Sequence, residues 1–213
     1  MSSSGGKRGA GGDSRHYYLA VGNTTMKLPT LTNLLHALSY TEPNLCVMIV
    51  CNCRAQLDEL VSALTKLRYE CSCLHSDMHS KWRKAVLDGF NNNENSPPIA
   101  EDREDGGAEE EGGGEGDGKP KGGMSILLSS DVCLPRPSSE ELTRDVRLVI
   151  NYDIPMKKEQ HLKRVKCILG SRGIFINFLV ANEVSMLKAL ESYTAPQSVE
   201  EMPLILSDLF VPT

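Results

Sequence analysis

Apolar residues along this chain fall into short runs of strand length that alternate with stretches of helical spacing. The run from Leu45 to Val50 is compact, as in a buried strand, and the leucines from Leu57 to Leu67 then recur at the spacing of one helix face. The same alternation continues on both sides of this unit. It predicts strands at His16 to Val21, Leu45 to Val50, Tyr69 to Leu74, Ser125 to Ser130, Val146 to Asn151 and Ile174 to Val180.

Helical patterns lie between most of these runs. They cover Leu28 to Leu38, Leu57 to Leu67, Ser80 to Phe90, Lys157 to Ile168 and Val184 to Leu190. Parallel neighbours need helical crossovers, so the order of elements predicts an α/β fold, a three-layer domain with a mainly parallel sheet. Ligands bind such sheets at the carboxyl ends of the strands, which makes the loops that leave strands the candidate functional edge.

Two stretches depart from this pattern. Asn91 to Gly123 holds nine glycines, ten acidic and three basic residues with almost no apolar ones, a composition that predicts a disordered acidic insert. Met1 to His16 is polar and predicts a disordered tail. Residues 17–213 are therefore expected to form a single domain, interrupted by the insert at 91–123.

The charge, the apolar runs and the cysteine content predict the cellular compartment and the oxidation state of the cysteines. The chain has 23 basic and 28 acidic residues, a net charge of −5. No apolar run approaches the roughly 18 residues that span a bilayer, and the start lacks a signal-peptide core, so we expect an intracellular protein of cytoplasm or nucleus with no membrane partner. Seven cysteines without an export signal are expected to be reduced. The pairs Cys51/Cys53 and Cys71/Cys73 place both sulfurs on one strand face, which favours packing; we predict no metal and no cofactor.

Several strand ends carry motifs. In this sequence Leu74 to Met78 reads L-H-S-D-M, Val149 to Pro155 reads V-I-N-Y-D-I-P, Glu201 to Pro203 reads E-M-P, and Val47 to Arg54 ends in N-C-R. With these motifs the chain resembles the C-terminal RecA-like domain of DEAD-box RNA helicases, especially their translation-initiation-factor branch, over roughly Tyr17 to Phe210.

For ATP chemistry, the resemblance implies a loss. The phosphate loop and D-E-A-D run of the family's N-terminal half do not occur here. In the family, arginines of H-R-I-G-R-x-G-R neutralise the transferred phosphoryl group. Arg164 matches the first, Cys167 stands at the second, and the last is missing or displaced to Arg172. The loop after Asp131 also lacks A-R-G-x-D, so these positions read as a vestigial nucleotide site and we predict no catalytic residue.

For RNA, the resemblance implies more. Family members hold RNA phosphates at this edge, and the matching positions here are Arg83, Ser130 and Asp131, joined by Lys163 and Arg164 of the basic helix. The alternative for that helix is a solvated charged face. Trp82 stands where the family usually has a charged residue; we expect it to be partly buried, the alternative being an exposed anchor for a partner.

The sequence thus predicts a stand-alone pseudo-helicase module that binds single-stranded RNA, a helicase-binding scaffold protein, or both, without hydrolysing ATP by itself. The alternative is a subunit that completes an ATP-dependent RNA helicase in trans. The acidic insert could mimic RNA or recruit a basic partner, but a solvated linker is the favoured interpretation.

Overall fold

The computed structural model describes residues 14–92, 123–136, 141–168 and 173–211. The predicted insert lies outside these residues except at its two ends, and so do Arg172 and most of the predicted tail. Ser14 to His16 do not belong to the tail that the sequence predicts, because Ser14 is buried and the first strand begins at Arg15. His16 fixes this start, because its ring is buried and stacks on Phe175.

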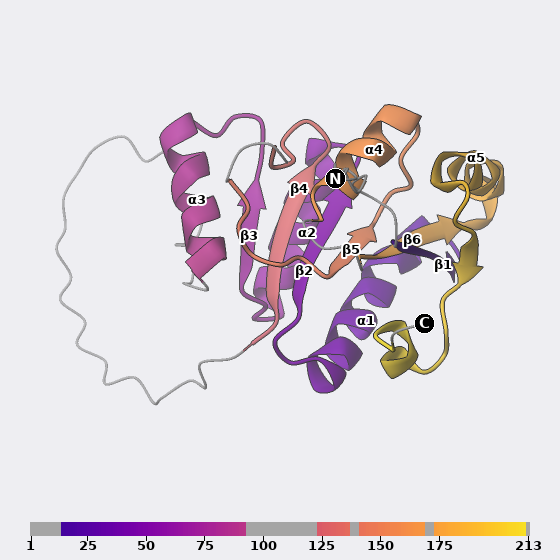
Figure 1. Ribbon diagram of the computed structural model, residues 1–213. Helices are drawn as coiled ribbons and strands as arrows, with labels where there is room; N and C mark the ends of the chain where they lie inside the picture. Colours follow the sequence, from indigo (N-terminus) through magenta and orange to yellow (C-terminus); the bar gives the residue numbers. More distant parts are fainter. Residues whose placement is uncertain (1–13, 93–122, 137–140, 169–172, 212–213) are drawn as a thin grey trace, which may run out of the picture.

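Within the described residues, seven strands form one sheet in the order β3-β4-β2-β5-β6-β1-β7, and every strand pairing is parallel (Figure 1). The predicted three-layer α/β fold is confirmed. The strands are β1 (Arg15–Val21), β2 (Cys46–Cys51), β3 (Cys71–Leu74), β4 (Ser125–Ser130), β5 (Leu148–Asn151), β6 (Ile174–Val180) and β7 (Val199–Glu201). The last of these, β7, was not predicted, because three residues with two glutamates carry no apolar alternation.

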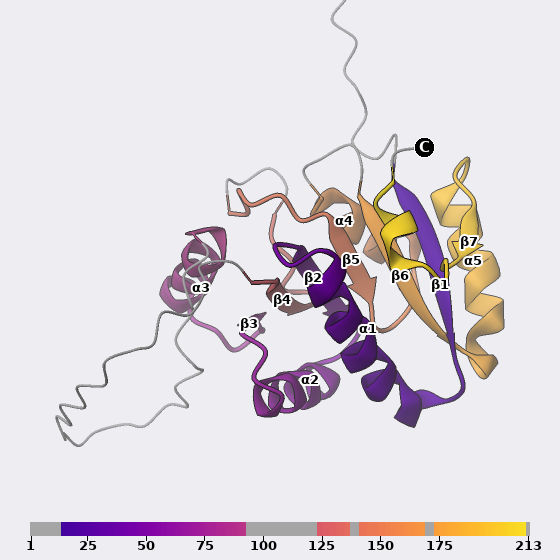
Figure 2. The ribbon, with the colours of Figure 1, turned by 90° about the horizontal axis from the view of Figure 1, so that it is seen from below.

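Helices cover both faces of the sheet (Figure 2). They are α1 (Lys27–Thr41), α2 (Arg54–Lys66), α3 (Ser80–Asn92), α4 (Lys158–Lys166) and α5 (Val184–Thr194), with short 3₁₀ turns η1 (Thr24–Met26), η2 (Ala181–Glu183) and η3 (Leu206–Leu209). No helix among the described residues is long and apolar enough to cross a membrane.

The two cores follow from the two-residue period of the central strand β2. Val47 and Ile49 face the core that α1 and α2 cover, whereas Met48 and Val50 face the core that Leu87 of α3 joins. All six residues of β2 are buried, as expected for a strand with helices on both sides. On α2, the leucines at 57, 60 and 64 are at most 2% exposed, and burying each contributes about 1.5–3 kcal/mol.

Candidate functional site

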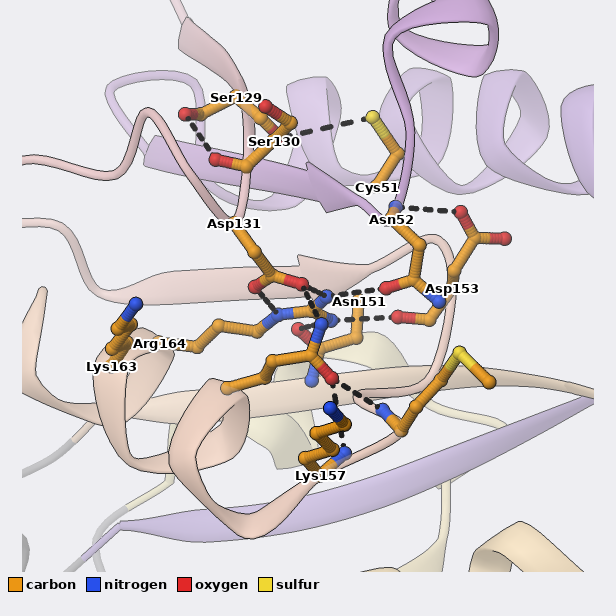
Figure 3. Close-up of polar contacts among 12 residues, drawn as sticks. Cys51, Asn52, Ser129, Ser130, Asp131, Asn151, Asp153, Lys157, Lys163 and Arg164 are labelled. Atoms are coloured by element: carbon orange, nitrogen blue, oxygen red, sulfur yellow. Dashed lines mark hydrogen bonds and ion pairs between the residues drawn. The ribbon is translucent and has the colours of Figure 1, made fainter.

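The carboxyl ends of β2, β4 and β5 meet beneath helix α4. Asn52, Asp131 and Asp153 follow these strands at one edge of the sheet, as the parallel topology requires (Figure 3). Asp131 and Asp153 are 8% and 5% exposed. Two carboxylates in so little water require cationic or N–H partners, and the neighbouring elements provide them.

Arg164 of α4 is the partner of Asp131. Its side chain is 0% exposed, and its Nε and Nη2 donate to the two oxygens of the Asp131 carboxylate, each at 2.7 Å. Nη1 donates to Asn151 Oδ1 at 3.0 Å and to the carbonyl of Asp153 at 2.6 Å, and Nη2 also donates to Asn52 Oδ1 at 2.8 Å. Every N–H of the guanidinium is therefore engaged inside the domain.

This geometry bears on one expectation from the sequence. We expected Arg164 to face an RNA phosphate, but its donors and the Asp131 carboxylate are turned toward each other. Ser130 is also buried, with its carbonyl accepting from the Ser129 hydroxyl. The structure brings these three residues together as expected; their part in RNA binding stays a prediction.

Arg83 of α3 is likewise held within the domain. Its guanidinium donates to the carbonyls of Cys133 and Leu134 at 2.9 and 3.4 Å and pairs with Glu141 at 3.1 Å. Burial alone would raise the pKa of Glu141, but the hydrogen bond from the backbone N–H of Arg136 and the guanidinium of Arg83 hold it below its usual value. The side chain of Arg83 remains 25% exposed, so it faces the edge without being free there.

Cys167 occupies the position of the family's second arginine. It is 2% exposed, and its thiol donates to the carbonyls of Lys163 and Pro135 at 3.3 and 3.6 Å. Burial, and then the charge of Asp131, raise its pKa to about 12, so the thiol is neutral near pH 7. The Cys167 thiol is thus neutral and the donors of Arg164 are engaged within the domain, while Arg172 lies outside the described residues.

A second buried pair was missed from the sequence. Lys27, 2% exposed, places its Nζ 3.1 Å from Asp153 Oδ1 and 3.6 Å from Glu183 Oε1. Gln56 Nε2 and the N–H of Asn52 also donate to the Asp153 carboxylate, both at 3.0 Å. A lysine at the start of a helix is ordinarily solvated, so nothing in the local sequence marked Lys27. Only the N-C-R and Y-D-I-P motifs pointed to this place.

The inner face of α4 is further fixed by Gln160 and His161. Gln160 Nε2 donates to Asp131 Oδ2 at 3.0 Å, and its Oε1 accepts from the N–H of Lys157 at 3.0 Å. His161 is 3% exposed and lies against His16, with ring centroids 5.3 Å apart. Burial, and then His161, lower the pKa of His16 to about 3; burial, and then Arg164, lower that of His161 to about 4.

The basic residues of α4 that do not point into the domain are exposed lysines. Lys163 is exposed, as the sequence predicted, and Figure 3 shows it turned away from the cluster around Arg164. Lys157, Lys158 and Lys166 are exposed as well, and none of the four forms an ion pair with another described residue. We call these four side chains the α4 lysine row: Lys157 is the N-cap residue of α4, Lys158, Lys163 and Lys166 lie on the helix, and the exposed Glu159 lies among them.

Trp82 on α3 corrects a further expectation, because it is 62% exposed and not partly buried. The residues of α3 that turn inward are Leu87 and Phe90, in its later turns. Trp82 lies in the first turns, beside the edge strand β3, where the sheet offers no further strand to pack on.

The remaining chemistry of the described residues is sparse. All seven cysteines are free, and no group of three or more His, Cys, Asp or Glu side chains there could hold a metal ion. The cysteines within β2 and β3 are mostly buried, and burial raises the pKa of Cys51 and of Cys73 to about 12. They pack as small apolar groups.

Comparison with known proteins agrees with this geometry. Residues 26–99 match the model of the helicase conserved C-terminal domain. Among curated proteins, eukaryotic initiation factor 4A of Caenorhabditis elegans is 28% identical over 92% of this chain, and the ATP-dependent RNA helicase eIF4A of Aspergillus clavatus is 27% identical over the same share. The chain spans 40% of the length of each of these two relatives.

Solved structures show the same fold. The C-terminal domain of the DEAD-box protein Dbp5 superposes with a TM-score of 0.63 at 17% identity, covering 95% of this chain and 96% of that one. Escherichia coli SrmB, solved with the regulator of ribonuclease activity A, gives a TM-score of 0.61 at 15% identity and covers 92% of this chain and 94% of that one. The resemblance to the C-terminal RecA-like domain of DEAD-box helicases is therefore confirmed.

Proposed function

We propose that this chain is a helicase C-terminal module that binds the phosphate backbone of single-stranded RNA through the α4 lysine row, without hydrolysing ATP by itself. The observation that carries the proposal is the division of positive charge at the carboxyl edge. Arg164 is saturated by Asp131 and its neighbours, whereas Lys163 and the other lysines of α4 have no counter-ion among the described residues.

The loss of ATP turnover is supported by two positions. Transfer of a phosphoryl group needs positive charge placed on the developing anion, and an arginine in that role is worth roughly 10³–10⁵ in rate. Here Cys167, a neutral buried thiol, stands at the position of the second family arginine. Arg164, at the position of the first, uses all its donors in hydrogen bonds to Asn52, Asn151, Asp131 and Asp153. Freeing Arg164 for a phosphate would leave Asp131 buried without its cation.

Binding to RNA is supported by charge and by relatives. Four exposed amines, three on one short helix and one at its N-cap, fit the spaced negative charge of a strand, and such contacts require no base readout. Yeast Dbp5, which has been solved bound to RNA, superposes on 91% of this chain with a TM-score of 0.64 at 17% identity, so a protein that contains this fold binds RNA. A protein ligand, as in the complex of SrmB with RraA, is the alternative occupant of the module.

The test is a paired measurement on the purified chain. Fluorescence anisotropy with labelled oligouridylate, repeated over several salt concentrations, should show binding that weakens steeply with salt because each bound phosphate releases counter-ions. No salt-sensitive binding even at low ionic strength would refute the RNA proposal and favour a protein scaffold as the ligand.

ATP turnover is measured on the same preparations. We expect none above the buffer rate, with or without RNA. Turnover that rises with protein concentration and saturates with ATP would contradict the proposal. Acceleration of a separate, phosphate-loop-bearing helicase half on mixing would instead support a subunit that completes a helicase in trans.

A further inference from the structure

The exposed indole of Trp82 lies on the same edge as the α4 lysine row. Helix α3 begins at Ser80, after the loop that leaves the carboxyl end of β3, and α4 follows the carboxyl end of β5. In a parallel sheet these ends share one edge. The first turns of α3 and helix α4 therefore face the same side of the domain (Figure 1).

The loop that leaves β4 joins the two helices into one surface. On the α3 side, Arg83, next to Trp82, donates to the carbonyl of Cys133 at 2.9 Å. On the α4 side, the Cys167 thiol donates to the carbonyl of Pro135 at 3.6 Å, and Arg164 binds Asp131. The loop is thus held from both sides within five residues, and Figure 1 shows it between α3 and α4.

The surroundings of Trp82 are basic. Lys81 and Lys84 are exposed on the same turns of α3, and neither forms an ion pair with another described residue. Val132, in the loop that leaves β4, is 81% exposed. A flat apolar ring between amines, on the same edge of the sheet as a second group of amines, matches a strand whose charged backbone carries flat bases.

The exposure of the Trp82 ring favours a role in binding. A tryptophan that is 62% exposed leaves a wide apolar area in water, which favours a ligand that covers it. Every nucleobase has a face that can stack on an indole, so such a contact requires no particular base. An acidic protein partner would also be attracted to the lysines, but the position of Trp82 on the same edge as the α4 lysine row favours the polymer proposed for that row.

We propose that Trp82 is a stacking platform for one base of the single-stranded RNA whose backbone the α4 lysine row binds. The proposal rests on the proposed RNA-binding function and adds to it a contact with a base. Backbone contacts alone accept any polyanion of suitable spacing. Stacking on Trp82 makes the module discriminate between RNA and a chain of the same charge that has no bases.

The chain has a single tryptophan, so its fluorescence reports on Trp82 alone. Titration with oligouridylate should quench this emission, whereas an abasic oligomer of equal length and charge should bind at low salt with little quenching. In anisotropy assays, W82A should weaken oligouridylate binding about fivefold or more and leave abasic binding unchanged. W82F, which keeps an aromatic face, should restore most of the loss.

A matched control is Tyr40 on α1, which is 76% exposed, because Y40A removes an exposed ring from a different helix. It should not change either affinity. If oligouridylate and the abasic oligomer bind equally and neither quenches, the stacking proposal is wrong, RNA binding stands, and Trp82 is assigned to a protein partner. If neither polymer binds at low salt, the proposed function and the stacking proposal both fail.

Discussion

The two faces of α4 carry neighbouring basic residues with opposite fates. Arg164, on the inner face, is 0% exposed and bonded through every N–H, whereas Lys163, one residue earlier, is exposed and unpaired among the described residues. Consecutive residues of a helix point about 100° apart, so one basic run divides between the interior and the surface. A charge run in a sequence is therefore not a single functional unit.

The difference has an energetic side. A buried arginine that loses contact with water is tolerated only when fully paired, and it then fixes its helix in one position. An exposed lysine costs little and remains available to a ligand. The inner face of α4 determines where the helix lies, and the outer face determines what the helix offers. The predictions below are designed to separate these two roles.

The largest effect is expected at the Arg164–Asp131 pair. R164A should lower the free energy of unfolding by about 3–5 kcal/mol, because it leaves the Asp131 carboxylate buried without its cation. Urea denaturation followed by far-ultraviolet circular dichroism measures the change. The matched control is K163A on the outer face, which should stay within about 0.5 kcal/mol of the wild type.

A double-mutant cycle sharpens this result. D131A and R164A/D131A complete the cycle, and the coupling free energy isolates the pair from the general loss of packing. Equal losses for R164A and K163A would show that the two faces of α4 do not differ in the way the geometry indicates.

Acid should act on the inner face through the two histidines. Their folded pKa values, about 3 for His16 and about 4 for His161, lie below the ordinary value of about 6.5, so the neutral forms are favoured in the folded protein. The unfolded chain then binds more protons, and stability falls as the pH drops below about 6.5. Between pH 7.5 and pH 5.0, each histidine should remove about 2 kcal/mol.

Urea midpoints at the two pH values test this, and H16Q/H161Q is the informative comparison. The variant should be less stable at neutral pH, because the packing on Phe175 is lost, but its stability should depend less on pH. His36, exposed on α1 beside Tyr40, supplies the control H36Q, which should keep the full wild-type pH dependence. A variant with unchanged pH dependence would exclude the buried pair as the titrating groups.

The sequence was enough to predict most of the fold. The compact apolar run of β2 and the leucine spacing of α2 identified a buried strand next to a helix, and the edge at which the motifs lie followed from the parallel order. The strand β7 was missed because pairing with β1, and not its own composition, makes it a strand.

The side-chain contacts of the site could not be predicted from the sequence, for a physical reason. A sequence shows that Arg164 and Asp131 are charged, but whether they face water or each other depends on a contact across 33 positions. Lys27 and Asp153 pair across 126 positions, and this contact is equally impossible to recognise in the sequence. Lys163 was placed correctly because exposure is the default for a lysine. Trp82 was misjudged since the default for a large ring is burial, and an edge helix does not provide it.

The smallest effect concerns the outer face alone and decides whether it has a ligand. K163E/K166E should weaken binding to labelled oligouridylate by about tenfold, because reversal removes two attractive contacts and adds two repulsive ones. The slope of log affinity against log salt should become shallower by about 1.4, from roughly 0.7 for each lost phosphate contact on a single strand. Fluorescence anisotropy over a salt series gives both quantities.

The double variant K163E/R164E would not be informative, because Arg164 is buried and its reversal would disrupt the fold as well as any binding surface. The matched control is K66E/R68E, which makes the same change in net charge at the end of α2. Helix α2 starts at the carboxyl edge after β2 and therefore ends at the opposite edge of the sheet, away from α4. If both double variants weaken binding equally, attraction depends on net charge and not on the α4 lysine row. If only K163E/K166E weakens it, the outer face of α4 is the RNA-binding surface, while the inner face holds it in place.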